Sequence, residues 1–500
     1  MGCLIAISGI TYILWNWKRH TTYINVEKPE LEITSWLWHS LIFAGAFILA
    51  KWESTLISPT HDEIFSAVNY SGSSLLHILT LYTSPNNHIF FNVVNHLFFA
   101  WFPDKVTSGR LLSQLAYAGT MLCVFRWLHK LMNNRCFALL TLLPVALQFN
   151  TLGFATMARG YELQLLCGWL AFMSLSDYLK TGEPGSLQKN TVFNILGFLL
   201  VPTYTYFFLS EVLFFAVAAF YLNRMKWKYW KYQVVLICSV FLFYLPAFCF
   251  SGVSAFTENR YVTSITPNLA TFLPDFISGS KGLAKYCFSY LFGDSNPVNY
   301  VLFLFPLLLF FSREKEHKLM AMFYTCLWLI YTALSLKMRL GAYQRNLTLQ
   351  LSFTMTFTTY TFYVIISALT NLFKNNSFRI VLRLICYGIP VILFGSHLFM
   401  YNKNNLSYML YGYNVNGMYS RSANQLPLIP KGSSIAFSGD SYYLYYLFRK
   451  YDYKVSKCSR GHEDYFVMAS DDHEAPPFER TGNYVFFTNG ISDYVVYKGK

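Results

Sequence analysis

A histidine and two carboxylates adjoin at His61-Asp62-Glu63, shortly after an apolar run that ends near Lys51. Ionisable side chains at the rim of a membrane are costly to retain, so a hydrated functional pocket is one explanation for them. A carboxylate at such a place suits the general-base half of an inverting sugar transfer, in which it accepts the proton of the attacking hydroxyl. The alternative is a solvated loop in which Asp62 caps a helix, and the residues alone leave both interpretations open.

A second polar group follows in Tyr82–Asn92, between two apolar stretches. It contains Asn86, Asn87 and His88, whose side chains carry donors and acceptors suited to a sugar or a phosphate. The alternative is a turn in which the two asparagines satisfy local backbone groups. Composition by itself favours the turn.

Two arginines stand where the charge bias of membrane proteins does not place them, Arg159 and Arg345. The planar guanidinium group matches phosphate oxygens with two parallel hydrogen bonds, which suits a phosphate-bearing lipid substrate. The alternative is that the long side chains reach the interface from apolar helices. For Arg345 we expect a phosphate contact.

Metal and nucleotide chemistry have weaker support. The side chains of His61, Asp62, Glu63 and His88 offer oxygen and imidazole ligands for a divalent cation, but their spacing matches no metal motif. A divalent metal is therefore left open, and no cofactor is predicted. The chain has no glycine-rich phosphate loop ending in Lys-Ser or Lys-Thr, so ATP hydrolysis is not indicated.

The composition places most of the chain in a membrane. Of the 500 residues 54% are apolar and only 13% charged, too few polar side chains to cover several soluble cores. Apolar runs of near-spanning length recur, among them Tyr232–Phe250, Leu319–Leu336 and Val381–Phe399. We expect an α-helical polytopic membrane protein with roughly 11 to 12 transmembrane helices at ~20 residues each. The short run Cys3–Trp15 is counted as a helix because no signal-peptide cleavage site follows it.

The net charge of +14 reflects membrane orientation, not nucleic-acid binding, because the basic residues lie mostly in short loops between apolar runs. We assign four of these loops to the cytoplasm: Lys130–Arg135, Asn223–Lys231, Arg313–Lys318 and Lys374–Arg383. Counting helices from them places three segments on the opposite side: Ser58–Ser108, Ser251–Pro297 and the tail after Tyr401. No nucleic-acid partner is expected.

The tail differs from the rest of the chain because long apolar runs stop. We predict a transmembrane unit over 1–400 and a small soluble extracytoplasmic α/β domain over 401–500, close to the usual lower size of a domain. The predicted elements in order are a strand, a helix and two strands: Ser433–Ser438, Tyr443–Lys450, Tyr484–Thr488 and Tyr494–Lys498.

The order of these motifs resembles the GT-C superfamily of polytopic membrane glycosyltransferases. It is similar in particular to the bacterial group related to protein O-mannosyltransferases and to the aminoarabinose transferases of lipid A. The motifs that carry the resemblance are, in order, His61-Asp62-Glu63, Ser84–His88, Gly109–Ser113, Ala158–Tyr161, Ser210-Glu211 and Tyr343–Arg345. The resemblance covers about the first four hundred residues.

The resemblance implies that Asp62 is the catalytic base and that Glu63 supports it. It also implies an inverting transfer from a polyprenyl-phosphate-linked sugar, with donor or phosphate contacts by a further set: His88, Arg159, Tyr161 and Arg345. The remaining polar residues, His61, Asn86 and Asn87, are expected to bind the acceptor or the sugar.

The expected partners are therefore the lipid donor, the membrane lipid and an acceptor that is a lipid, a glycan or a protein. The expected location is the bacterial inner membrane, with the active site facing the periplasm or the exterior. These expectations leave the identity of the sugar and of the acceptor open.

Three other functions fit part of the sequence. A flippase or transporter for a lipid-linked saccharide shares many helices and outer arginines, but no repeated halves are visible. An O-antigen-type polymerase shares the composition, whereas the early Asp62-Glu63 pair and the soluble tail favour the transferase. In a non-catalytic envelope scaffold, substitution of Asp62 has little effect.

Overall fold

A computed structural model describes residues 33–82, 87–98, 100–102, 104–222, 227–252, 255, 291, 298–338, 344–371, 373, 375–411, 415–437, 442–456, 463–469, 485–488 and 493–498. Several predicted features lie outside these residues: the Cys3–Trp15 run, Ser84–Asn86, most of Ser251–Pro297 and Tyr343. Of Arg345 only the backbone is described.

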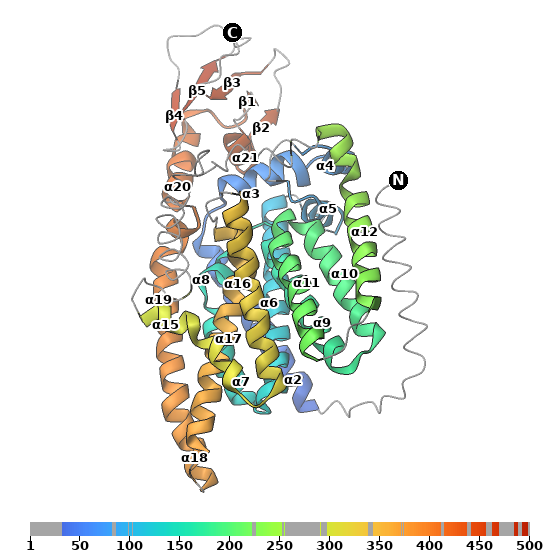
Figure 1. Ribbon diagram of the computed structural model, residues 1–500. Helices are drawn as coiled ribbons and strands as arrows, with labels where there is room; N and C mark the ends of the chain where they lie inside the picture. The colour runs from blue at the N-terminus through green and yellow to red at the C-terminus, as the bar shows by residue number, and fades with distance from the viewer. Residues whose placement is uncertain are drawn as a thin grey trace, which may run out of the picture.

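Long helices packed side by side form the bundle that makes up most of the molecule (Figure 1). They are α2 (Ile33–Leu56), α6 (Lys105–Met132), α9 (Tyr161–Thr181), α10 (Pro184–Leu200), α11 (Thr205–Tyr221), α12 (Trp227–Ser251), α16 (Lys315–Met338), α17 (Thr348–Thr370) and α19 (Ile389–Tyr411). Shorter helices connect them: α3 (His61–Ser66), η2 (Ala67–Ser71), α4 (Leu75–Thr80), α5 (Ile89–Phe98), α7 (Arg135–Ala146), α8 (Phe149–Ala155), η3 (Pro202–Tyr204), α15 (Val298–Leu304), η4 (Phe305–Phe311), η5 (Gln344–Leu347), α18 (Asn376–Arg383), η6 (Leu384–Gly388), α20 (Val415–Gln425) and η7 (Leu426–Leu428).

Within the described residues, four helical segments are long and apolar enough to cross a membrane, and six if two bent pairs each count as one span. One bent pair joins Trp36–Leu56 to His61–Ser71 at an angle of 101°. The fold is thus that of a polytopic α-helical membrane protein, as predicted. The expected total of roughly 11 to 12 spans also included Cys3–Trp15, which the described ranges do not contain.

Apolar side chains face outward on the peripheral helices, and hydroxyl-bearing side chains face inward. On α12, Val234, Ile237 and Phe241 are exposed, as expected of a surface in contact with lipid. On the central α17, buried threonines return their hydroxyls to the preceding turn, as in the 2.7 Å bond from Thr354 to the carbonyl of Gln350. A helix rich in Ser and Thr can therefore lie in the middle of the bundle with most of its buried hydroxyls bonded to its own backbone.

The two ends of the bundle differ, because one carries basic loops and the other carries the β-strands of the tail. The loop between α6 and α7, with the basic residues at Lys130–Arg135, and α18 lie at the end remote from the β-strands (Figure 1). Helices α3, α4 and α5 lie at the other end, beside the strands. The described parts of Ser58–Ser108 and of the C-terminal tail, which are predicted to share one side of the membrane, lie at the same end of the bundle.

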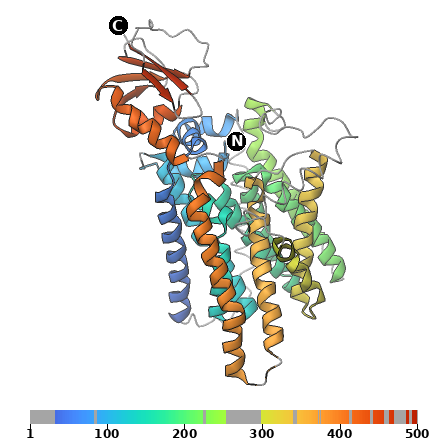
Figure 2. The ribbon, with the colours of Figure 1, turned by 90° about the vertical axis from the view of Figure 1, so that its left-hand side faces the viewer.

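The tail carries a mixed five-stranded sheet of order β2-β1-β3-β5-β4, which sits above one end of the bundle (Figure 2). Its strands are β1 (Ser434–Phe437), β2 (Lys454–Ser456), β3 (Tyr465–Ala469), β4 (Val485–Thr488) and β5 (Asp493–Lys498), with helix α21 (Tyr442–Lys450) between β1 and β2. Strand β1 pairs in parallel with β2 and β3, whereas β5 pairs antiparallel with β3 and β4.

The predicted strand, helix and two strands correspond to β1, α21, β4 and β5. The sequence did not predict β2 and β3. Strand β2 has three residues, of which Lys454 and Ser456 are polar, too short and too polar for an alternation signal. Helix α19 continues to Tyr411 and β1 begins at Ser434, so the expected boundary at residue 400 stays a prediction.

A carboxylate joins the start of β1 to the start of β3. Asp464 accepts hydrogen bonds from the backbone N–H and the hydroxyl of Ser434 at 2.7 and 3.0 Å. These two bonds, made only in the folded chain, lower the pKa of Asp464 below its ordinary value of 3.8. A folded-state pKa that is lowered contributes stability above pH 3.8, and this contribution disappears as the pH falls through the folded-state pKa.

We therefore expect Asp464→Asn to lower the thermal unfolding temperature of the full chain in detergent near pH 7. The difference from the wild type should shrink as the pH falls below 4, because the wild-type carboxylate is then protonated as well. The matched control is Asp452→Asn, an exposed residue of the same domain whose φ of 65° suits asparagine. A difference that stays constant from pH 3 to 7 would contradict the assigned role.

Candidate active site

The helix that carries the His61-Asp62-Glu63 motif begins with a reciprocal cap. The backbone N–H of Glu63 donates to the Thr60 hydroxyl at 3.3 Å, and the backbone N–H of Thr60 donates to the Glu63 carboxylate at 2.9 Å. Threonine followed three residues later by glutamate is the sequence pattern of this cap. The cap fixes the start of α3 and places Asp62 in its first turn.

The Glu63 carboxylate is fully buried and forms a bidentate ion pair with Arg110 of α6. Its two oxygens accept from Nε and Nη2 of Arg110 at 2.7 and 2.9 Å. The backbone N–H of Ala158 donates to the same carboxylate at 2.7 Å. Four donors from three segments therefore hold one side chain, which has no exposed surface through which a substrate could reach it.

The same arginine closes the end of α2. Arg110 donates to the carbonyl oxygens of Ser54, Ile57 and Ser58 at 3.1, 2.8 and 3.0 Å. The last carbonyl groups of a helix have no partner within the helix, so they need donors from elsewhere when they are buried. Arg110 thereby holds the break at which the chain turns by 101° from α2 into the α3 segment.

Close backbone approach brings these partners together. A Cβ atom on Gly109 would lie 2.7 Å from Cβ of Ala158, a distance that real side chains do not adopt. Glycine at this position lets α6 contact the Ala158 turn directly. The neighbouring Arg110 then reaches Glu63 while Glu63 reaches the Ala158 backbone.

A second buried arginine joins α3 to the start of α9. Arg159 is 1% exposed and donates to the Ser66 hydroxyl at 2.8 Å and to the Asp62 carbonyl at 3.4 Å. Its other terminal nitrogen lies 3.2 Å from Nε2 of His88. The Gly160 N–H donates to Nδ1 of the same imidazole at 3.0 Å. The structure thus brings together Asp62, His88 and Arg159, which lie far apart in the sequence.

The two adjacent carboxylates occupy different environments. Asp62 is partly exposed at the surface of α3, whereas Glu63 points into the protein and has no exposed surface. The sequence pairs them as a catalytic group, but only Asp62 has access to a substrate. The position of Glu63 indicates that it orients the turn on which Asp62 stands.

His61, the first residue of the motif, contacts the C-terminal domain. The hydroxyl of Tyr442 lies 2.8 Å from Nδ1 of His61, and the rings of His61 and Tyr443 stack at 6.2 Å. Apolar residues of α3, such as Ile64, share one buried cluster with Ile435 of β1. Helix α3 therefore lies between the bundle and the C-terminal domain.

The asparagine that the structure describes in the second polar group has a structural role. The side-chain amide of Asn87 donates to the carbonyl oxygens of Ile78 and Leu81 at 3.0 and 2.8 Å and accepts from Asn92 at 2.9 Å. This arrangement matches the local-turn interpretation of the sequence. Asn86 lies outside the described residues.

The remaining predicted residues lie at the same end. Tyr161 is buried and packs edge-on against His88, with ring centroids 4.9 Å apart. Arg345 belongs to η5, which leads into α17, and Leu349 of α17 packs against Gly168, two turns into α9. The backbone of Arg345 therefore lies near the end of the bundle that carries α3.

A metal site has no support in the described part of the chain. No three His, Cys, Asp or Glu side chains there lie close enough together to hold a metal ion. The possible metal ligands of the sequence are used otherwise, because Glu63 pairs with Arg110 and His61 contacts Tyr442.

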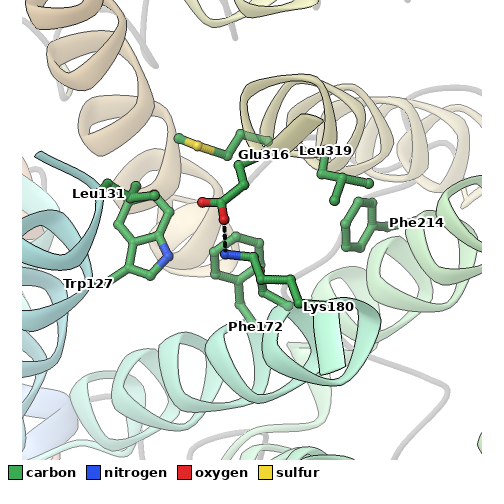
Figure 3. A pocket seen from close by; sticks show the side chains of 9 residues that line it. Trp127, Leu131, Phe172, Lys180, Phe214, Glu316 and Leu319 are labelled. Atoms are coloured by element: carbon green, nitrogen blue, oxygen red, sulfur yellow. Dashed lines mark ion pairs between the residues drawn. The ribbon is translucent and has the colours of Figure 1, made fainter. Parts of the chain in front are cut away.

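A small cavity at the opposite end of the bundle is not a substrate site. Trp127, Phe172 and Phe214 are among the side chains that line it, and the ion pair of Lys180 and Glu316, at 2.8 Å, crosses it (Figure 3). Its volume of about 10 Å³ is about that of one water-sized probe. The cavity therefore reflects packing between α9 and α16.

Comparison with solved structures identifies the same fold in a membrane protein. The chain is similar to ArnT from Cupriavidus metallidurans bound to undecaprenyl phosphate, with a TM-score of 0.52 and 11% identity over 92% of this chain and 97% of that one. The apo structure of the same protein gives a TM-score of 0.50 and 11% identity over 93% and 98%. No family model and no curated protein matches the sequence. At this identity the similarity shows a shared polytopic helical fold and not a reaction.

Sequence reasoning missed the partners of the motif residues. It included Arg110 in a motif but did not pair it with Glu63, and it gave no role to Tyr442. Both contacts join residues far apart in the chain, and no local spacing encodes them. One local signal for the role of Glu63 was available. Thr60 and Glu63 have the spacing of a capping box, in which the glutamate side chain bonds to the helix start and not to a substrate.

We expect Glu63→Gln to destabilise the protein by about 3–5 kcal/mol, because it leaves the buried Arg110 charge without its anion. Asp62→Asn is the matched control one residue away, and at this partly exposed site it should change stability by less than about 0.5 kcal/mol. Denaturant or thermal unfolding of the full chain in lipid nanodiscs gives both values. Equal losses of stability in the two variants would show that the difference in burial has no energetic consequence.

Proposed function

We propose that the protein is an inverting glycosyltransferase that moves a sugar from a polyprenyl-phosphate donor to an envelope acceptor. The observation that carries the proposal is the position of a buried guanidinium group beneath the helical turn that bears a partly exposed carboxylate. Arg159 donates to the backbone of Asp62 itself, so a fixed positive charge lies within one helical turn of the candidate base. The fold shared with ArnT, which was crystallised with undecaprenyl phosphate, supports a lipid-phosphate donor.

In the proposed reaction the Asp62 carboxylate accepts the proton of an acceptor hydroxyl. The hydroxyl oxygen forms the new bond to the anomeric carbon as the bond from that carbon to the phosphate oxygen breaks. The electron pair of the broken bond stays on the phosphate, and polyprenyl phosphate leaves. Nucleophile and leaving group lie on opposite faces of the sugar ring, so the configuration inverts.

The negative charge that develops on the leaving phosphate needs a cation that is already in position. We assign this electrostatic role to Arg159, whose contacts with Ser66 and His88 fix its guanidinium group. Arg345 is the second candidate for a direct phosphate contact, on the basis of its place before α17. We assign His88 and Tyr161 to holding Arg159 in place, and Glu63 to orienting α3.

The proposed location is a bacterial inner membrane, with the α3 end and the C-terminal domain on the periplasmic or exterior side. The support is the distribution of charge, because basic loops gather at the opposite end of the bundle. The acceptor is left as a lipid, a glycan or a protein. A lipid-linked-saccharide flippase and an O-antigen-type polymerase are the alternatives that the following experiment separates.

We expect Asp62→Asn to reduce sugar transfer by about 10²–10⁴-fold, the usual contribution of a general base. Transfer from a panel of labelled polyprenyl-phosphate sugars is measured with the full chain in nanodiscs, together with the release of polyprenyl phosphate. The control is Asp177→Asn, which removes an exposed carboxylate at the other end of the bundle and should leave transfer unchanged.

Full transfer by folded Asp62→Asn protein would refute the proposed base. Movement of labelled donor across liposomes without transfer, and insensitive to Asp62→Asn, would favour a flippase. Growth of a polymer in place of a single transfer would favour a polymerase.

A further inference from the structure

A cavity of about 530 Å³ lies where the C-terminal domain meets the bundle. One wall comes from the bundle and includes Ala67, Val68 and Phe102. The other wall comes from α21 and the turn after it, and includes Tyr445 and Tyr446. The volume lies in the range of ~300–1,000 Å³ that is usual for small-molecule sites.

Three cations and two carboxylates line this cavity. Lys105 stands on the bundle side, and Arg449 and Lys450 stand on α21. The carboxylate of Asp104 accepts from the N–H of Val106 and from the hydroxyl groups of Thr107 and Tyr446, at distances of 2.6–3.3 Å. These bonds cap the start of α6 and fix the carboxylate without removing its charge. Asp452 is the other anionic group, so three cations against two carboxylates give the lining a formal net charge of +1.

One of these cations, Lys450, is held by tyrosines of the domain. The ammonium group of Lys450 lies over the rings of Tyr419 and Tyr446, 5.5 and 5.9 Å from their centroids. The Tyr446 hydroxyl is fixed in turn on Asp104, and burial together with that nearby carboxylate raises its pKa. Tyr446 is therefore neutral at physiological pH. Its ring orients the Lys450 ammonium group, and it carries no negative charge that would compete with an anionic ligand for that group.

The cavity is lined in part by the helical segment that also carries the candidate base. Ala67 follows Asp62 by five residues on the continuous helical segment of α3 and η2, which corresponds to a rise of about 7.5 Å. His61 on the same segment contacts Tyr442 of α21. At about 100° per residue the side chains of Ala67 and Asp62 point about 140° apart around the helix axis. A molecule that fills the cavity and rests on the C-terminal domain therefore reaches Asp62 by extending around α3.

We infer that this cavity binds an anionic group, a phosphate or a carboxylate, on the saccharide acceptor. Guanidinium and ammonium groups bind such oxygens with charge-assisted hydrogen bonds, and the apolar and tyrosine walls accommodate the body of the sugar. The inference deepens the proposed function, because it rests on Asp62 acting upon an acceptor. The C-terminal domain then selects the acceptor, whereas the bundle binds the donor.

The test measures binding of glucose 1-phosphate, glucose and inorganic phosphate to the full chain in nanodiscs of zwitterionic lipid. We expect Arg449→Ala/Lys450→Ala to weaken glucose 1-phosphate binding by about tenfold or more, because two cations are lost, with little effect on glucose. The matched control is Lys431→Ala/Lys454→Ala, which removes two exposed cations of the same domain outside the cavity. Equal glucose 1-phosphate affinity in the wild type and the cavity variant would overturn the inference.

A second arm separates an acceptor from a membrane lipid as the source of the anion. The same measurement is repeated in nanodiscs that contain phosphatidylglycerol. Unchanged glucose 1-phosphate binding is expected, because the cavity then selects the saccharide anion. Loss of this binding in the wild type alone would assign the cavity to a lipid headgroup and overturn the assignment to an acceptor.

The inference and the proposed function can fail separately. Asp62→Asn should keep glucose 1-phosphate binding while it loses sugar transfer. Transfer that depends on Asp62, with binding that is insensitive to the cavity variant, would leave the transferase standing and refute the cavity. Binding that depends on Arg449 and Lys450, in a protein that neither transfers sugar nor responds to Asp62→Asn, would refute the assignment to an acceptor together with the transferase.

Discussion

The buried ion pair of Glu63 and Arg110 is the contact on which the arrangement of this end of the molecule depends. Arg110 donates to the carbonyl oxygen of Ile57 just after α2 and to the Glu63 carboxylate in the first turn of α3. The same carboxylate accepts from the backbone N–H of Ala158, so the three segments are held together. A buried charge pair is costly unless all of its groups are bonded, and here carbonyl oxygens and amide groups provide the remaining partners. The sharp turn of the chain and the position of the neighbouring Asp62 both follow from this pair.

The same constraint separates the roles of two adjacent carboxylates. On a helix, neighbouring side chains point about 100° apart, so Glu63 enters the protein while Asp62 stays at the surface. Arg159 then adds a buried positive charge beneath the turn and holds it to His88 and α9. In the proposed function this turn supplies one accessible carboxylate for the proton transfer and one fixed cation for the leaving phosphate.

The C-terminal domain belongs to this arrangement. Its helix α21 packs on α3, and Tyr446 bonds to the residue that caps α6. The cavity between the two parts is therefore lined by residues from both, and its cations come mostly from α21. In the proposed function one end of the bundle supplies the reacting groups and the domain above it supplies recognition of the acceptor.

The sequence by itself determined the elements, because apolar runs and turn residues act locally. It predicted the helical membrane fold, the strands β1, β4 and β5 of the tail, and the location of Ser58–Ser108 and the tail at the same end of the bundle. It also identified Asp62, His88 and Arg159 as residue types suited to a site. Only the tertiary structure decided that Glu63 is bound to Arg110, that Asn87 serves a turn and that His61 meets Tyr442. These contacts join positions up to 381 residues apart, and chain folding, not local spacing, sets such distances.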